Sequence, residues 1–213
     1  MYDMLFNGDI INAFQFSSET GYKTLRKLNA RTFEDLISGN ALMRLRASEG
    51  EQPLDKYIRF KNDSTAWDQE MDDYGLNDNE RATLHALLDQ YNGICSSQEL
   101  LMQLSMKVAG FDLVKANALR KAIAKKDPIK QAKQHDIFIA EGVKNNQRET
   151  FLEYCWKNCI EIQKGYAFSL PHAIPYTMIL ITEMNICKNY GILYWKTACL
   201  NVNAKTLSDE IIS

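Results

Sequence analysis

The chain has 213 residues, of which 46% are hydrophobic and 24% are charged, as in an ordinary globular protein that is long enough to bury a hydrophobic core. Its formal net charge of −2 gives no reason to expect a polyanionic partner for the chain as a whole. Its most apolar segment is broken by Glu183 and Lys188, which excludes a membrane span. The scarcity of glycine and proline, 10 and 4 residues, favours helices over a turn-rich sandwich or barrel and predicts a mainly α fold with at most a few short strands.

The N-terminal part, residues 1–47, is predicted to be helical after a short apolar stretch at 9–16, DIINAFQF, which is typical of a strand or an extended segment. Serine and threonine in SSETGYKTLRKL are capping candidates for a first helix. A second helix is predicted from RTFEDLISGNALMRLRA. There Thr32 is the expected N-cap and Asp35 occupies the third helical position, close to a capping box.

Residues 48–80 are polar, acidic and poorly periodic. We expect a long loop or insertion, with PLDKYIRF as one short element. Residues 68–80 hold six acids and no base, but they lack a D-x-D pair bracketed by apolar strand residues, as a two-metal site would usually show. A solvated loop is therefore the favoured interpretation.

Residues 81–133 are predicted to contain three helices. The first is NERATLHALLDQY, and the second is SSQELLMQLSMKVAG, with Ser96 or Ser97 as its cap and Gly110 as its end. The third, DLVKANALRKAIAKK, has Asp112 as its cap and ends before Asp127-Pro128.

The third of these helices belongs to a strongly basic run. Residues 115–133 contain seven basic residues and one acid, and Lys121 and Lys125 share a helix face with Arg120 beside them. A solvated face is the usual interpretation of such lysines. The density of like charge also favours an anion, and phosphate or nucleic acid is the anion that Arg and Lys bind best. Both interpretations stay open on the spacing alone.

The C-terminal part, residues 134–213, is predicted to be helical on both sides of a histidine loop, GYAFSLPHAIPY. His172 lies there between Pro171 and Pro175, and a helix is expected to begin near Ile174 or Pro175. A lone histidine at a helix start is more often a structural hydrogen-bonding group than an anion ligand, although helix N-termini attract anions.

The five cysteines include no C-x-x-C pair; Cys155 and Cys159 are spaced to share a helix face, but no histidine lies near these two in sequence. Reduced, buried thiols of a cytoplasmic protein are favoured over a metal site. The first ten residues, MYDMLFNGDI, lack the basic and apolar regions of a signal peptide.

Four segments, taken in chain order, resemble one family. AFQFSSETGYKTLRKL is similar to the FQxES-GM…LxxL segment of bacterial replicative DNA polymerase III alpha subunits, the family C polymerases, and FEDLISGNALMRLRA is similar to their FEDLIAxxALxRPGP. NGICSSQELLMQLSMKVAGFDLVKANALRKAIAKK resembles YGIxxYQEQVMQIAxxLAGYSLGEADxLRRAMGKK, and GYAFSLPHAIPYTMI resembles GYGFNKSHAAAYAxI. The resemblance covers roughly residues 2–200 and implies one fingers module over residues 1–213.

In that family the fingers domain is mostly helical and binds the incoming nucleotide triphosphate and the template-primer. The resemblance therefore implies a phosphate-binding site, whose residues by motif position are Arg44, Arg120, Lys121, Lys125, Lys126 and His172. It implies DNA and dNTP as ligands, a palm-containing polymerase chain or domain as partner, and the cytoplasm of a bacterial or phage-infected cell as location.

The family's catalytic aspartates lie in palm segments, PDxDxD and FDFLGL, that are not in this sequence. We therefore expect the chain to be inactive alone, to bind no cofactor itself, and to meet Mg²⁺ only together with a palm domain. An exposed palm-facing surface would allow self-association in isolation.

Several motif positions depart from the family: Lys121 replaces an arginine, Leu170 replaces the lysine beside the histidine, and Ser97 replaces an aromatic residue. These departures suggest a divergent, phage-type relative of the family. They also leave open the alternative that the chain is an interaction protein derived from a polymerase, which binds a replication or host protein and no nucleotide. A generic helical nucleic-acid-binding domain would need only the basic helix.

Overall fold

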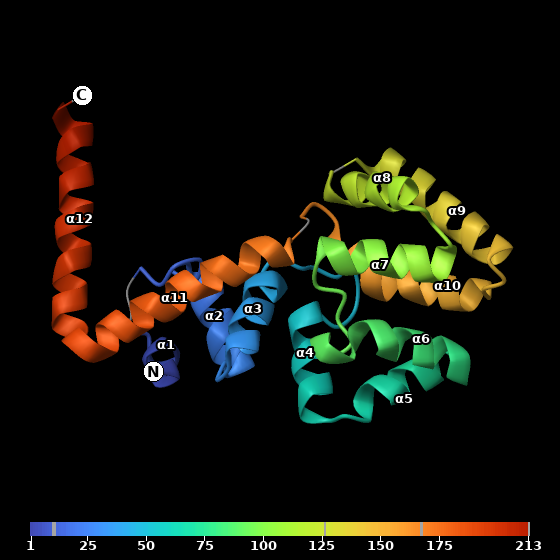
Figure 1. Cartoon of the computed structure of the whole chain (residues 1–213), viewed down its shortest axis with the longest axis horizontal. Helices are drawn as coiled ribbons and strands as arrows, with labels where there is room; N and C mark the ends of the chain where they lie inside the picture. The colour runs from blue at the N-terminus through green and yellow to red at the C-terminus, as the bar shows by residue number, and fades with distance from the viewer. Residues whose placement is uncertain (10–11, 126, 167, 213) are drawn as a thin grey trace. The chain divides into compact units, whose positions relative to one another are not determined.

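The computed structural model describes residues 1–9, 12–125, 127–166 and 168–212. These residues form twelve α-helices and no strand, which confirms the predicted mainly α fold (Figure 1). The α-helices are α1 (Tyr2–Asn7), α2 (Glu19–Leu28), α3 (Phe33–Leu42), α4 (Pro53–Asn62), α5 (Ala66–Asp73), α6 (Asp78–Leu88), α7 (Gln98–Ala109), α8 (Leu113–Ala124), α9 (Pro128–Lys144), α10 (Glu149–Cys155), α11 (Leu170–Tyr190) and α12 (Ile192–Ile212). Short helical segments are the 3-10 turns η1 (Asp89–Tyr91) and η3 (Glu161–Gln163) and the π-helical turn η2 (Trp156–Ile160).

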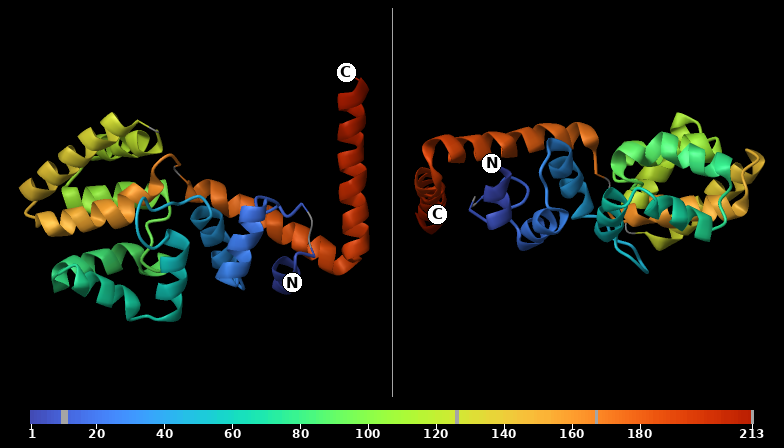
Figure 2. Two further views of the ribbon diagram at one scale, coloured as in Figure 1. Left: turned by 180° about the vertical axis from the view of Figure 1, so that it is seen from behind. Right: turned by 90° about the horizontal axis from the view of Figure 1, so that it is seen from below.

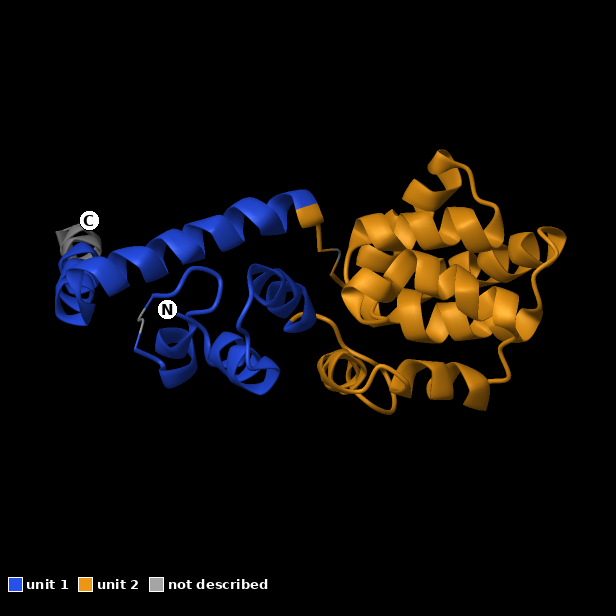
Figure 3. Cartoon of the chain, turned by 60° about the horizontal axis from the view of Figure 1, so that its bottom comes forward, with its two compact units in different colours: residues 1–43, 171–213 blue, residues 44–170 orange. Residues whose placement is uncertain are grey.

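The chain divides into two compact units. Unit 1 consists of Met1–Met43 and Pro171–Ser213, so both ends of the chain contribute to it, and unit 2 is the intervening segment Arg44–Leu170 (Figure 3). The predicted single module over residues 1–213 is not tested by this division and stays a prediction. Within the part of the chain that the structure describes, none of the helices combines the length and the hydropathy of a membrane-crossing segment.

Unit 2 is built around α7, which packs against α8 and α9, while α9 also packs against α10 (Figures 1 and 2). Leu101, Leu104 and Val108 are spaced at helical intervals on α7 and are buried, as the predicted apolar stripe requires. Leu119 of α8 and Phe138 of α9 are also buried. Burying side chains of this size contributes about 1.5–3 kcal/mol each, so the core fixes α8 and α9 firmly enough to position the charged residues on their outer faces.

Local sequence fixes several helix ends. The Thr32 side chain accepts a hydrogen bond from the Asp35 N–H, and the Asp35 carboxylate accepts one from the Thr32 N–H, so the predicted capping box is confirmed. Asp112 caps α8 as predicted, and Ser97 is the serine that caps α7. Gly110 ends α7 with a φ of +68°, in the left-handed region that favours glycine.

In unit 1, α3 packs against α2 at Gly39, where a β-carbon would lie 3.4 Å from Cδ2 of the buried Leu28. The N-terminal part meets α11 at Phe14. The Phe14 N–H donates to Glu183 Oε2 at 2.8 Å, and the Phe14 ring lies edge-on to Tyr176, with 5.1 Å between the centroids. These contacts join the two ends of the chain into one unit.

The short strand predicted within residues 9–16 is wrong for the residues that the structure describes there. Asn12 and Gln15 have φ angles of 56° and 67°, and such left-handed backbone is incompatible with the extended conformation of a strand. Asn12 and residues 14–16 lie in turns. Residues 10–11 lie outside the described part of the chain.

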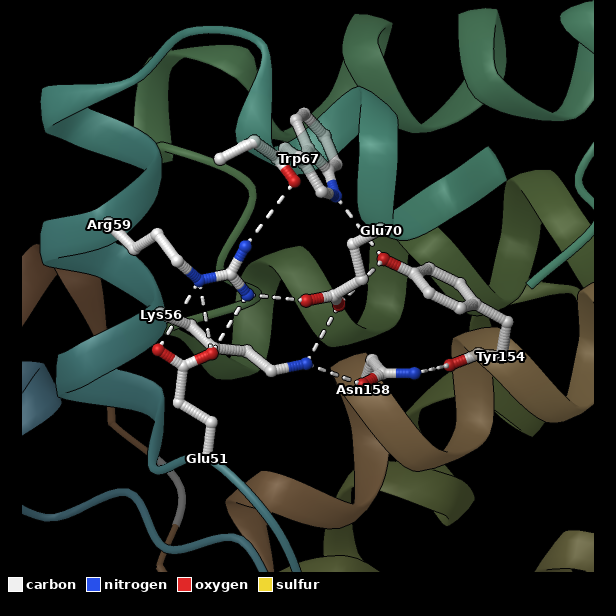
Figure 4. A network of polar contacts seen from close by, with 8 residues as sticks. Glu51, Lys56, Arg59, Trp67, Glu70, Tyr154 and Asn158 are labelled. Carbon is white, nitrogen blue, oxygen red and sulfur yellow. Dashed lines mark hydrogen bonds and ion pairs between the residues drawn. The ribbon is translucent and has the colours of Figure 1, made fainter. Parts of the chain in front are cut away.

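The acidic segment 48–80 is not the long loop that its composition predicted. It contains α4, α5 and the start of α6. The reason is that its acids are paired with bases once the helices pack: Glu70 accepts hydrogen bonds from Lys56 Nζ and Arg59 Nη2, both at 2.7 Å (Figure 4). We call this group the Glu70 cluster, and it consists of Glu51, Lys56, Arg59, Trp67, Glu70, Tyr154 and Asn158.

The second half of the histidine segment is helical rather than a loop, because the helix expected to begin near Ile174 or Pro175 begins earlier, at Leu170. The Leu170 N–H is satisfied by Glu99 Oε2 of α7 at 3.1 Å. This cap comes from a residue 71 positions away, so the local sequence cannot reveal it. His172 consequently lies in the first turn of α11.

Candidate functional site

Four lysines surround an open depression on the surface of unit 2. Lys121 and Lys125 come from the C-terminal end of α8, and Lys130 and Lys133 come from the first turns of α9. The depression has a volume of about 350 Å³. We call it the lysine depression, and its other lining residues are Ala118, Ala122 and Gln134.

The sequence explains why these lysines meet. Lys121 and Lys125 are four residues apart and therefore lie on the same face of α8 and its C-cap. α9 begins directly afterwards, at Pro128, with the Asp127 side chain as its cap. The Gln131 amide of α9 donates to the Lys125 carbonyl oxygen at 2.7 Å and so fastens the end of α8 to the next helix.

Three of the four charges in the lysine depression are not compensated within the described residues. Lys130 Nζ pairs with Asp127 Oδ2 at 2.8 Å, and this hydrogen bond raises the pKa of Lys130. No acid in the described part of the chain lies within ion-pair distance of the ammonium groups of Lys121, Lys125 or Lys133. Neighbouring charges of one sign repel each other, and a bound anion relieves that repulsion.

Arg120 does not line the lysine depression but is held against α7. Its Nε and Nη2 donate to Asn117 Oδ1 at 3.1 and 2.9 Å, and its Nη1 donates to Gln98 Oε1 at 2.8 Å. Both partners are neutral amides, so the guanidinium is fixed in place while its charge stays uncompensated. Of the five N–H donors of a guanidinium, three are used here and two remain for an anion.

The other predicted site residues lie elsewhere. The Arg44 guanidinium carbon lies 5.4 Å from the centroid of the Tyr166 ring, within unit 2. His172 belongs to unit 1, where its exposed ring contacts Tyr176, with 3.8 Å between the ring centroids. Lys126 lies outside the described residues.

Sequence reasoning does not identify four residues of this region. Lys130 and Lys133 are part of the basic run at 115–133, and the continuation of that run beyond the helix break is the signal that could have found them. Gln98 and Asn117 carry no charge and belong to no charge pattern. Their part in holding Arg120 becomes visible only when α7 and α8 pack together.

The cysteines do not contribute to this site. All five are free and buried. Burial raises the pKa of Cys95 and Cys155 well above the usual range and that of Cys159 to about 12, so these thiols stay protonated at neutral pH. Among the described residues, no group of three or more His, Cys, Asp or Glu side chains is arranged to hold a metal ion.

Comparison with known proteins gives one consistent result. A family model described as "Bacterial DNA polymerase III alpha subunit finger domain" matches residues 1–146, which include α7, α8 and α9. The chain is 35% identical over 212 residues to a probable DNA polymerase, YorL, of Bacillus subtilis and equally to a DNA-directed DNA polymerase of Bacillus phage SPbeta, covering 99% of this chain and 16% of each relative. It is 31% identical over 178 residues to the DNA polymerase III subunit alpha of Pseudomonas aeruginosa, covering 84% of this chain and 15% of that protein. The chain thus spans about one sixth of the length of the curated relatives that it matches.

Proposed function

The chain belongs to the bacterial DNA polymerase III alpha subunit family, as the finger domain of an alpha-like enzyme, and on this premise we propose that it binds the phosphate groups of template-primer DNA and of the incoming deoxynucleoside triphosphate. The observation that carries the proposal is the lysine depression, in which three uncompensated ammonium groups surround an open hollow. Phosphate is the anion that such a group binds through charge-assisted hydrogen bonds.

The shape of the lysine depression favours DNA backbone as its occupant. Between the lysines its lining is alanine, apart from Gln134, so it offers charge without base-specific hydrogen bonds. Contacts of this kind fix the position of a nucleic acid without reading its sequence. We therefore assign Lys121, Lys125 and Lys133 to backbone phosphates of the template-primer.

Arg120 has the features of a triphosphate ligand. Its guanidinium is already held by Asn117 and Gln98, and two of its N–H groups remain for non-bridging phosphate oxygens. We assign Arg44, Lys126 and His172 to the nucleotide by their motif positions. His172 would donate a hydrogen bond to the nucleotide or to the leaving pyrophosphate, and its exposure in α11 supports this role.

We propose that the chain does not transfer the nucleotide alone. Two-metal phosphoryl transfer requires carboxylates that hold Mg²⁺ beside the primer 3′-hydroxyl, and we assign these to a palm domain or palm-containing chain of the enzyme. The finger residues would neutralise the phosphates and hold them for that reaction, which is the electrostatic part of catalysis.

The proposal is tested by the salt dependence of DNA binding. The affinity of the 213-residue chain for a fluorescein-labelled primed duplex is measured by anisotropy between about 50 and 200 mM salt. The variant Lys121→Ala/Lys125→Ala/Lys133→Ala should bind more weakly, and its slope of log K against log salt should fall by about 2–3, because each lysine displaces about 0.9 counterion from duplex DNA. A control with the same change of charge, Lys107→Ala/Lys157→Ala/Lys188→Ala, should keep the slope of the parent chain.

Equal slopes for the two triple variants would refute the assignment of DNA to the lysine depression. If the parent chain binds neither the duplex nor dATP at low salt, the alternative is favoured that the chain is an interaction protein that binds no nucleotide.

A further inference from the structure

We propose that Gln98 is a positioning residue for Arg120, whose guanidinium it holds so that two N–H groups stay available for triphosphate oxygens. The inference rests on the proposed role of Arg120 in phosphate binding. It adds a residue that carries no charge and does not itself bind the phosphate.

The guanidinium of Arg120 is supported from two helices. Asn117, one turn earlier on α8, accepts from Nε and Nη2 and so fixes one edge of the group. Gln98, the first residue of α7, accepts from the remaining nitrogen, Nη1, at 2.8 Å. Asn117 belongs to the same helix as Arg120, so its hydrogen bonds alone would not fix the guanidinium relative to α7. The hydrogen bond to Gln98 of α7 holds the guanidinium in place relative to the packed core of unit 2.

The orientation of the Gln98 amide is itself determined. Its Nε2 donates to Glu99 Oε1 at 3.1 Å, so its oxygen must be the atom that faces Arg120. The Glu99 carboxylate is in turn held by the Ser169 hydroxyl at 2.9 Å and by the Leu170 N–H at 3.1 Å. A continuous set of hydrogen bonds therefore runs from the start of α11 to the guanidinium.

The neutrality of Gln98 has a chemical consequence. A carboxylate at this position would form an ion pair with Arg120 and compensate the charge that attracts phosphate. An amide oxygen holds the same group by one hydrogen bond and leaves its full charge for a ligand. Pre-organisation of this kind raises affinity because the side chain is ordered before the ligand arrives.

The variant Gln98→Glu tests this role because it changes the charge while almost preserving the shape. We expect binding of inorganic triphosphate, measured by isothermal titration calorimetry on the 213-residue chain, to weaken about tenfold or more. The melting temperature should not rise, since the gain from the new ion pair with Arg120 is opposed by repulsion between the new carboxylate and Glu99, which loses the hydrogen bond from Gln98 Nε2. The control Gln103→Glu adds the same charge to an exposed position on α7 and should weaken binding less than about twofold.

A second variant, Gln98→Met, removes the oxygen without adding a charge. It should weaken triphosphate binding about threefold, because Asn117 still holds one edge of Arg120. In the background of Arg120→Ala, neither substitution at Gln98 should change the affinity further, whereas an effect of charge on the surface in general would persist there.

The outcomes separate this inference from the proposed function. If Arg120→Ala leaves triphosphate binding unchanged, the assignment of Arg120 fails and the inference fails with it. If Arg120→Ala weakens binding while both Gln98 variants bind like the Gln103→Glu control, the positioning role is overturned and the proposed function stands.

Discussion

The variant Glu70→Gln should lower the free energy of unfolding by about 2–3 kcal/mol. The Glu70 side chain is 13% exposed and the Lys56 side chain 18%, so this pair is largely removed from water, whereas Arg59 is 37% exposed. Without the carboxylate, Lys56 has only neutral amide oxygens as partners, among them that of Asn158 at 2.9 Å, while Arg59 keeps its ion pair with Glu51. Most of the loss should therefore come from Lys56. Its expected size lies between about 0–1 kcal/mol for a surface pair and about 3–5 kcal/mol for breaking a buried one.

The measurement is urea unfolding followed by circular dichroism, with the melting temperature as a second readout. A loss of about 2–3 kcal/mol should lower the melting temperature by about 5–10 °C for a chain of this length. Glu51→Gln is the matched control, because it removes the same charge from the exposed side of Arg59 and should cost about 1 kcal/mol or less. The double variant Lys56→Met/Glu70→Gln should recover most of the loss, since it leaves no unpaired ammonium group in the cluster.

Two results would contradict this reasoning. One is a cost for Glu70→Gln no larger than that of Glu51→Gln, which would mean that the cluster behaves as a surface ion pair. The other is a loss of unfolding free energy in the double variant that equals the sum of the losses in Lys56→Met and Glu70→Gln, because additive losses would mean that the two charges are not coupled.

Two further predictions concern Glu99 and the cysteines. Burial alone would raise the pKa of Glu99, but hydrogen bonds from Leu170, from its own N–H, from Ser169 and from Gln98 outweigh burial and lower the pKa. The ionised Glu99 side chain therefore stabilises the fold at pH values above its unfolded pKa of about 4.3. This stabilisation is lost as the pH falls through the pKa of the folded state. Glu99→Gln should therefore unfold more easily at neutral pH and show a flatter pH dependence of stability below about pH 4; parallel acid-unfolding curves for the variant and the parent would contradict this. The buried cysteines, with raised pKa values for their thiols, should be alkylated by iodoacetamide slowly in the native chain and rapidly in urea, as mass spectrometry can follow, and fast native labelling of Cys159 would show that the thiol is reached without unfolding.

The parts of the fold that could be predicted are those fixed by neighbouring residues. The capping box of Thr32 and Asp35 and the end of α7 at Gly110 depend on residues within one helical turn. The start of α11 depends on Glu99, which lies 71 positions earlier than Leu170, and no local pattern contains that information. The segment 48–80 was predicted as a loop because its acids were counted without the bases that pair with them after packing.

The candidate site follows the same division. Lys121 and Lys125 could be placed on one face from their spacing of four residues, and this holds in the structure. The two lysines of α9 that complete the depression, and the amide of Gln98 that holds Arg120, depend on how the helices meet. Residue spacing predicts which side chains share a face of one helix, but it does not predict how two helices meet. A site formed by several helices can therefore be predicted only in part from the sequence.

The division of the chain has a consequence for biosynthesis. Unit 1 needs both Met1–Met43 and Pro171–Ser213, and the bond from the Phe14 N–H to Glu183 joins residues 169 positions apart. At a synthesis rate of about 5–20 residues per second, the N-terminal helices must wait on the order of 10 s on the ribosome before their partner helix emerges. Unit 2 is contiguous and can fold during that interval. Helices α1, α2 and α3 are thus synthesised before unit 2 but gain their partner α11 after it, and in the interval the side chains that pack against α11 are exposed to chaperones and proteases.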